Sequence, residues 1–237
     1  MIYDIKLLKK ETVAKDTMTF YWEKPTDFEY TAGQNGDFTL IDPPETDDEG
    51  NKRTFSFVST PSNENLITTT RMRGSAFKRS LKNLPVGTIV KLDGPYGDFI
   101  LHKNQAKPAV FLIGGIGITP VRSIIADATH NHLPYKITLI YSNRTPDGAP
   151  FIAELENFAK NNPNFKFVPV YTKVSEKQWS GEKGHIDLQM LKKYIPEPAL
   201  PIYYLSGPAT MVKAMRRLLI EVGADEDNIR VEEFSGY

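Results

Sequence analysis

The first hundred residues alternate short runs of β-branched and aromatic side chains with turn-forming residues, a pattern typical of β-strands. We expect strands at residues 2–8, 17–22, 37–41, 53–59, 65–70 and 88–92. One helix is predicted between them at 75–84, with Ser75 as a candidate N-cap. Strands of this length and spacing predict a small antiparallel barrel or sandwich.

From residue 109 the pattern changes, because apolar runs now alternate with stretches whose apolar residues recur at helical spacing. Strands are expected at 109–113, 136–141, 165–170, 202–205 and 229–234, and helices from Pro120 onward and around 151–159, 188–194 and 211–222. This alternation predicts a parallel sheet that binds ligands at the carboxyl ends of its strands. Since the polar segment 102–108 separates the two patterns, we expect an antiparallel β-barrel domain at 1–104 and an α/β domain at 105–237.

Composition narrows the classes of partner and site. The 29 basic and 29 acidic residues cancel, so charge gives no reason to expect a nucleic acid or an anionic membrane as partner. The chain has no cysteine, which excludes disulfides, thiolate zinc sites and protein-ligated iron–sulfur clusters. Its four histidines show no metal-ligand spacing, and no metal is expected.

Two expectations concern solvent and location. Residues 42–52, which include Asp47, Asp48 and Glu49, are rich in proline and acidic residues and are expected to be a solvated loop. No apolar run approaches ~18 residues, and residues 1–6 lack a signal-peptide pattern. A cytoplasmic protein is therefore expected.

A glycine turn follows the first strand of the second half. Gly114, Gly115 and Gly117 come directly after the apolar run 109–113, and Pro120 suits the first turn of a helix. A strand, a glycine turn and a helix N-terminus together present free N–H groups to a phosphate. The spacing departs from the Rossmann fingerprint, which has a further glycine at a fixed offset. The segment suits a nucleotide pyrophosphate, and a tight packing turn that binds no ligand has the same pattern.

The predicted barrel carries two further candidate anion sites. Arg53, Phe55 and Phe57 share one face of a strand, which suits a ligand with an anionic part and a flat ring. A barrel strand with core phenylalanines and a surface arginine has the same pattern. Arg71 and Arg73 precede the predicted helix start.

Two segments of the second half add to these candidates. Residues 206–212 repeat the strand–turn–helix arrangement after a different strand. Arg144 follows the strand 136–141 in a stretch without Asp or Glu, which slightly favours NADPH over NADH, because a guanidinium can bind a ribose 2′-phosphate. A solvated loop arginine explains the same residue nearly as well.

Taken in order, these motifs resemble those of the ferredoxin–NADP reductase family over essentially the whole chain. The resemblance implies a flavin-binding barrel followed by a nicotinamide-nucleotide domain, with FAD and NAD(P)H as cofactors. The family's Arg-x-aromatic-Ser element is similar to Arg53, Phe55 and Ser56, which would pair with the pyrophosphate, stack on the isoalloxazine and bond near N5. The implied FAD-binding residues are Arg53, Thr54, Phe55, Ser56, Arg71, Arg73, Gly74, Ser75 and Ala76.

The second half resembles the family's nicotinamide-binding elements. The implied residues are Gly114, Gly115, Gly117, Ile118, Thr119 and Pro120 in the glycine turn, with Gly207, Pro208 and Met211 in a Cys-Gly-Pro-x-x-Met-like element and Arg144 added by the argument above. Ser206 stands where the family usually has cysteine, and Phe55 where tyrosine is common. Residues 231–234 resemble the family's ending, in which a carboxylate and an aromatic lie against the flavin.

The resemblance therefore implies Ser56, Ser206, Glu232 and Phe234 as catalytic residues, with Tyr237 competing with Phe234 for the flavin face. It implies a reductase that transfers hydride from NAD(P)H to FAD. Since the chain has no cysteine for a cluster, a separate acceptor would take the electrons: a ferredoxin, a flavodoxin, an oxygenase component or a small molecule. The alternatives are a non-catalytic flavin-binding electron-transfer or sensing subunit of a larger complex, and a nucleotide-binding scaffold without flavin. The acceptor and the oligomeric state stay open.

Overall fold

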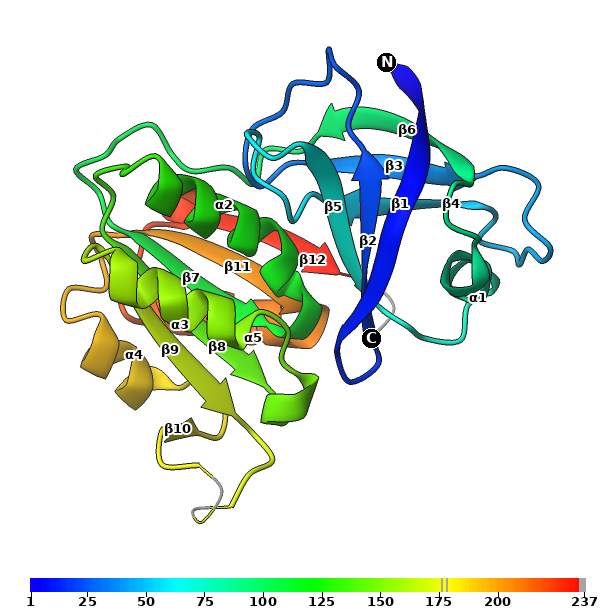
Figure 1. Cartoon of the computed structure of the whole chain (residues 1–237). Coiled ribbons are helices and arrows are strands. Elements are labelled where there is room, and N and C mark those ends of the chain that lie inside the picture. The colour runs from blue at the N-terminus through cyan, green and yellow to red at the C-terminus, as the bar shows by residue number, and fades with distance from the viewer. Residues whose placement is uncertain (176, 178, 235–237) are drawn as a thin grey trace.

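The computed structural model describes residues 1–175, 177 and 179–234, and folds them into two six-stranded sheets (Figure 1). The first sheet consists of β1 (Ile2–Ala14), β2 (Thr17–Glu23), β3 (Asn35–Leu40), β4 (Lys52–Ser56), β5 (Asn65–Arg71) and β6 (Ile89–Tyr96). Its order is β4-β3-β6-β1-β2-β5, and every pair is antiparallel. The six predicted strands and the barrel-like antiparallel architecture are confirmed.

Burial of alternate side chains holds this sheet together. Leu7, Phe20, Trp22 and Phe38 are almost fully buried in one apolar cluster, and the indole N–H of Trp22 donates to Thr68 Oγ1 at 2.9 Å. The predicted helix is α1 (Ala76–Asn83), which Ser75 caps by accepting from the Lys78 N–H. β1 runs to Ala14, beyond its predicted end, because its polar second half pairs with β2.

The second sheet is parallel, with the order β10-β9-β8-β7-β11-β12. Its strands are β7 (Ala109–Gly114), β8 (Ile137–Asn143), β9 (Phe165–Tyr171), β10 (Glu182–Lys183), β11 (Ile202–Pro208) and β12 (Ile229–Phe234). The prediction missed β10, a two-residue strand without an apolar pattern. The chain changes sheet between β6 and β7, and the division into domains near residue 104 stays a prediction.

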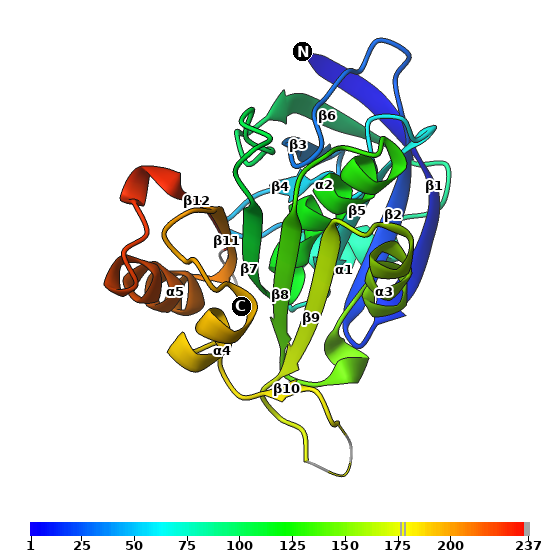
Figure 2. The same ribbon diagram turned by 90° about the vertical axis from the view of Figure 1, so that its left-hand side faces the viewer.

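Helices cover both faces of this sheet (Figure 2). One face packs against α2 (Ile118–His130) and α3 (Ile152–Asn161), and the other against α4 (Leu188–Tyr194) and α5 (Ala209–Glu221). Three short 3₁₀ turns complete the described part, namely η1 (Gly115–Gly117), η2 (Pro146–Gly148) and η3 (Glu226–Asn228). The α/β prediction is confirmed, and none of the described helices is both long and apolar enough to cross a membrane.

Two sets of hydrogen bonds, one made by α2 and one by Arg71, join the two halves of the molecule, whose sheets lie side by side in Figure 1. In the first, α2 donates from Arg122 Nη1 to Val58 O at 2.9 Å and from Ser123 Oγ to Ser59 O at 2.5 Å. In the second, Arg71 donates to Lys15 O at 2.8 Å and to Gly148 O at 2.5 Å. Each set ties a loop or strand end of the barrel to a helical element of the other half.

Candidate functional site

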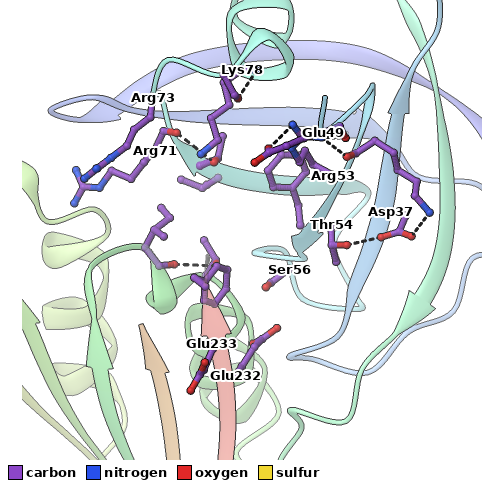
Figure 3. Close-up of a pocket in the computed structure, with 18 residues that line it drawn as sticks. Asp37, Glu49, Arg53, Thr54, Ser56, Arg71, Arg73, Lys78, Glu232 and Glu233 are labelled. Carbon is purple, nitrogen blue, oxygen red and sulfur yellow. Dashed lines mark hydrogen bonds and ion pairs between the residues drawn. The ribbon is translucent and has the colours of Figure 1, made fainter. Parts of the chain in front are cut away.

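A cavity of about 750 Å³ lies between the two sheets (Figure 3). The barrel lines it from β3, β4, β5 and the start of α1, and the second half lines it from η1, α2 and the end of β12. The predicted site residues on its wall are Arg53, Thr54, Phe55, Ser56, Arg71, Arg73, Ser75, Thr119, Glu232 and Phe234. The fold thus brings together the barrel motifs and the predicted C-terminal residues, which are far apart in sequence.

The other predicted residues lie elsewhere. Gly74 and Ala76 flank the wall residue Ser75. Outside the residues that line the cavity are also Gly114, Gly115, Gly117, Ile118, Pro120, Arg144, Ser206, Gly207, Pro208 and Met211. Tyr237 falls outside the described residues.

The wall nearest α1 is cationic. Arg53, Arg73 and Lys78 all line it, and Figure 3 shows Lys78 coming down from α1 on the same side as Arg73. Burial lowers the pKa of the Lys78 amine, and repulsion from Arg73 and Arg53 lowers it further. A bound anion would relieve this repulsion. Lys78 is not among the residues predicted from the sequence, although its place three residues after the N-cap Ser75 puts it beside the helix N-terminus.

Arg53 is held mainly by the acidic loop, residues 42–51, and little of its side chain is exposed to solvent. Its Nη1 donates to Glu49 O at 2.8 Å and to Lys52 O at 2.7 Å, and its Nη2 pairs with Glu49 Oε2 at 2.7 Å. Asp47 Oδ1 lies 3.4 Å from the same Nη2. The loop is mostly exposed, as predicted, yet the carboxylates of Asp47 and Glu49 both pair with a guanidinium on the next strand, which the sequence analysis did not anticipate.

The second oxygen of Asp47 lies at the N-terminus of α1. Ala76 donates its backbone N–H to Asp47 Oδ2 at 2.8 Å. This bond lowers the pKa of the Asp47 carboxyl, and Arg53 lowers it further. The Asp47 carboxylate thus contacts both Arg53 and the N-terminus of α1, the two groups that the sequence predicts to bind a pyrophosphate.

Phe55 and Ser56 follow Arg53 on β4 and face opposite ways. The Phe55 ring is 9% exposed and packs against Phe38 and Phe77, with centroids 5.7 and 5.9 Å apart. Most of its surface therefore belongs to the barrel core, and only a small part reaches the cavity wall. Ser56 is also buried and appears in Figure 3 near the centre of the site.

Arg71 has a structural task in addition to its place on the wall. Its guanidinium donates to Lys15 O, Thr17 Oγ1 and Gly148 O, so it links the β1–β2 turn to η2. Arg73 forms no ion pair with a described residue. Of the two predicted arginines, Arg73 is the one whose charge is available to a ligand.

Glu232 forms part of the opposite wall, at the end of β12 (Figure 3). Burial raises the pKa of its carboxyl to about 7, Asp98 adds to the rise, and a hydrogen bond with Asn35 opposes it. Its Oε2 is buried without a hydrogen-bond partner among the described residues. A carboxyl with these properties can exchange a proton near neutral pH.

The glycine turn packs tightly against the end of β11 and the first turn of α5. A Cβ on Gly117 would lie 2.6 Å from the backbone carbon of Ser206, and a Cβ on Gly114 would meet Met211 Sδ. Gly115 has a φ of 53°, which favours glycine. Internal packing and backbone conformation thus account for the three glycines without a ligand. Pro120 lies in the first turn of α2, as predicted.

Ser206 lies beneath this glycine turn and Arg144 lies on the surface. The Ser206 side chain is fully buried, and its Oγ has no hydrogen-bond partner among the described residues. In the register of β11 and β12, Ser206 is opposite Glu232. Arg144 is exposed, directly after the end of β8.

Comparisons with known proteins give a domain family for part of the chain and a fold for the whole of it. Residues 111–217 match the model of the oxidoreductase NAD-binding domain. The ferredoxin NADP⁺ reductase from Neisseria gonorrhoeae, solved with bound FAD and NADP, superposes with a TM-score of 0.82 at 22% identity, covering 98% of each chain. Residues 111–217 belong to the oxidoreductase NAD-binding domain family, and the whole chain has the two-domain fold of ferredoxin–NADP reductase. The Neisseria protein binds FAD and NADP, the cofactors that the sequence resemblance implies.

Two curated relatives show how the family fold is used in longer proteins. In Klebsiella pneumoniae, a component of the Na⁺-translocating NADH-quinone reductase is 32% identical over 159 residues, which are 65% of this chain and 39% of that protein. The reductase component of the glycine betaine monooxygenase of Chromohalobacter salexigens is 28% identical over 230 residues, 95% of this chain and 61% of that one. The chain thus spans about two-fifths to three-fifths of the length of these relatives.

The cavity of this ferredoxin–NADP reductase-like chain fits the family's cofactors chemically. Arg73 and Lys78 supply positive charge, and the Asp47 carboxylate already stands between Arg53 and a helix N-terminus, where a phosphate oxygen would find the same donors. On the other wall, Glu232 Oε2 is a buried polar atom able to bond a bound group, and Ser206 Oγ is buried behind that wall.

Proposed function

We propose that this chain is an FAD-dependent reductase that takes electrons from NAD(P)H and passes them to a separate acceptor. The observation that carries the proposal is the cavity itself, which joins a cationic wall with a helix N-terminus to the carboxyl end of a parallel sheet. Bound FAD would supply the redox chemistry, accepting two electrons from the nicotinamide and releasing them singly.

The barrel wall would hold the flavin nucleotide. Arg53, Arg73 and Lys78 provide charge for the pyrophosphate, and the first N–H groups of α1 provide hydrogen bonds. We propose that Phe55 and Ser56, as the sequence implies, lie beside the flavin ring system. Since little of the Phe55 ring is exposed, its contribution is an edge or a small part of a face rather than a full stack.

The second half would hold the nicotinamide nucleotide at the glycine turn and the start of α5. Its pyrophosphate would lie at the N-terminus of α2, near Gly115 and Thr119. Gly207, Pro208 and Met211 shape this turn by packing against Gly114. We propose Arg144 as the residue that meets a ribose 2′-phosphate.

Three side chains near the meeting point of the sheets would act on the reacting groups. Ser56 would orient them through its hydroxyl, Ser206 would act from behind the cavity wall as the neighbour of Glu232 in the sheet, and Glu232 would hold or release a proton at its buried carboxyl. Phe234 lines the cavity at the end of β12, where it would cover one side of the bound ring until the nicotinamide displaces it.

The acceptor is proposed by class only. The relatives from the monooxygenase and the quinone reductase are parts of larger systems, which supports a separate protein or cofactor domain as the acceptor. Since the 237 residues contain no cysteine, they offer no thiolates for an iron–sulfur cluster that would relay electrons.

An absorbance experiment tests the proposal. The purified protein should show a flavin spectrum that bleaches on anaerobic addition of NADH or NADPH, and a one-electron acceptor such as ferricyanide should restore it. Flavin that dithionite reduces and neither nicotinamide nucleotide reduces would favour a non-catalytic flavin-binding role. A protein that binds a nicotinamide nucleotide and takes up no FAD would favour a scaffold without flavin.

A further inference from the structure

The acidic loop, residues 42–51, reaches the groups that should hold the flavin pyrophosphate. Its Asp47 carboxylate accepts from Ala76 N at 2.8 Å with one oxygen and lies 3.4 Å from Arg53 Nη2 with the other. We propose, on the basis of the proposed function, that Asp47 is an internal ligand that competes with the flavin pyrophosphate for Arg53 and the N-terminus of α1. The carboxylate must leave before a phosphate binds both donors.

The chemistry of the contact supports competition. A carboxylate and a phosphate accept hydrogen bonds from the same donors, a guanidinium and the first N–H groups of a helix. Both donors are bonded to Asp47, so a phosphate oxygen at either one meets a negative charge. Two other cations of the wall, Arg73 and Lys78, have no ion pair with a described residue and would attract the ligand first.

The loop is built so that Asp47 can move without the rest of the wall. On one side, Glu45 is fixed to α1 by its ion pair with Arg79, at 2.5 Å. On the other side, Asn51 Nδ2 donates to Leu40 O at 2.7 Å. Between these anchors, residues 47–50 form a turn closed by Gly50, whose φ is 73°. A local change in this turn is enough to withdraw the carboxylate.

Arg53 would keep its place when Asp47 leaves. Its Nη1 still donates to Lys52 O at 2.7 Å, which lies outside the turn, whereas its bonds to Glu49 move with the turn. The guanidinium also lies over the Phe77 ring, 5.2 Å from its centroid. Removing the Asp47 carboxylate should therefore expose a preformed anion site instead of dismantling it.

The experiment compares Asp47→Ala with the parent protein and with the matched control Asp48→Ala. Asp48 is exposed in the same loop, and its carboxylate forms no ion pair or hydrogen bond with a described residue. Flavin is first removed from each protein. Affinity for inorganic pyrophosphate is then measured by calorimetry, and affinity and association rate for FAD by quenching of flavin fluorescence.

Asp47→Ala should bind pyrophosphate and FAD roughly threefold to tenfold more tightly than the parent, because a partly exposed charged competitor is gone. FAD should also associate faster, and Asp48→Ala should match the parent. Asp47→Asn, which keeps an acceptor for Ala76 and loses the charge, should fall between them. Should Asp47→Ala fail to fold, Asp47→Asn takes its place as the deciding variant.

Two outcomes overturn the inference. Weaker binding in Asp47→Ala would show that Asp47 positions the site instead of competing for it, and binding equal to that of Asp48→Ala would show that the carboxylate is irrelevant. Failure of the proposed function looks different, because no protein would then bind FAD while the effect of Asp47 on pyrophosphate persisted.

Discussion

Two helix N-termini of this molecule are both predicted from the sequence to bind a phosphate, and they differ in which groups they contact. At the start of α1, a side-chain carboxylate from a distant loop accepts from Ala76 N and pairs with Arg53. At the start of α2, the glycine turn packs against the backbone of β11 so closely that Gly117 leaves no room for a Cβ. The first is a site defined by charge and the second by shape.

This difference teaches which changes each site tolerates. A charged site can lose one group and keep its geometry, because neighbouring bonds hold the remaining donors. A site formed by two closely packed backbone segments cannot keep its geometry in this way, because any added atom must displace the main chain. Substitutions at the glycine turn should therefore act mainly on folding, and substitutions near α1 mainly on ligand affinity.

The largest effect is expected for Gly117→Ala. Its Cβ would lie 2.6 to 2.8 Å from backbone atoms of Ser206 and Gly207, so we expect a loss of about 3 kcal/mol in the free energy of unfolding. Gly74→Ala is the matched control, because a Cβ there meets nothing within 4 Å. Denaturant unfolding of both variants measures the difference. Equal stability of the two variants would remove the packing explanation for the turn.

The second largest effect is expected for Glu232, which lines the cavity between the two sheets. Its pKa of about 7 exceeds the ordinary 4.5, so the folded protein binds more protons than the unfolded chain between these values. Stability should therefore fall as pH rises from about 4.5 to 7 and stay lower above it. The free energy of unfolding of Glu232→Gln should exceed that of the parent protein by roughly 2–3 kcal/mol at pH 8 and by little at pH 4.

Denaturant unfolding of the flavin-free protein at these two pH values measures this. Glu233→Gln, at the exposed neighbour, serves as the control and should show no such pH-dependent gain. A gain for Glu232→Gln that is the same at pH 4 and pH 8 would mean that the carboxyl is not the cause.

The third effect tests the charged site itself. Arg53→Ala removes a charge-assisted hydrogen bond worth about 1.5–3 kcal/mol, so FAD affinity should fall at least tenfold while the protein stays folded. Arg216→Ala is the control, since Arg216 pairs with Glu226 outside the cavity wall. Flavin content after purification and fluorescence titration provide the measurement. Full flavin occupancy in Arg53→Ala at low FAD concentration would exclude Arg53 from the site.

The smallest effect is expected at Arg144, which is exposed beyond both regions. Arg144→Ala should lower the ratio of kcat/KM for NADPH to that for NADH about threefold, because an exposed ion pair is worth under 1 kcal/mol. NADH provides the internal control within the same variant. A ratio that does not change would leave Arg144 as a solvated loop residue.

The fold could be predicted well because apolar periodicity reports which side chains are buried. The helix at Leu188–Tyr194 matches its predicted bounds, and every predicted strand is present. The pattern failed where burial gives no signal. β10 has two charged residues, and the extension of β1 to Ala14 is a polar strand held by its neighbour.

The site was harder to predict, because its decisive contacts join residues far apart in the chain. Nothing in an acidic, proline-rich segment reveals that Asp47 meets Ala76, 29 positions later. Arg71 shows the same problem in reverse. Its basic side chain suggested a ligand, and the structure binds it to Gly148, 77 positions away. The local sequence shows which charged side chains need a partner, but it does not show which distant residue the fold brings to them.

The two sets of hydrogen bonds between the two halves also bear on how the molecule can move. Arg122 and Ser123 hold one barrel segment, and Arg71 holds another. A body attached at one point can swing, whereas a body attached at two separate points loses most of its rotational freedom. The gap between the sheets should accordingly keep its width when ligands enter, and the adjustment falls to the small turn at residues 47–50. Entry of the flavin nucleotide would then be timed by the movement of one short turn rather than by the closure of two lobes.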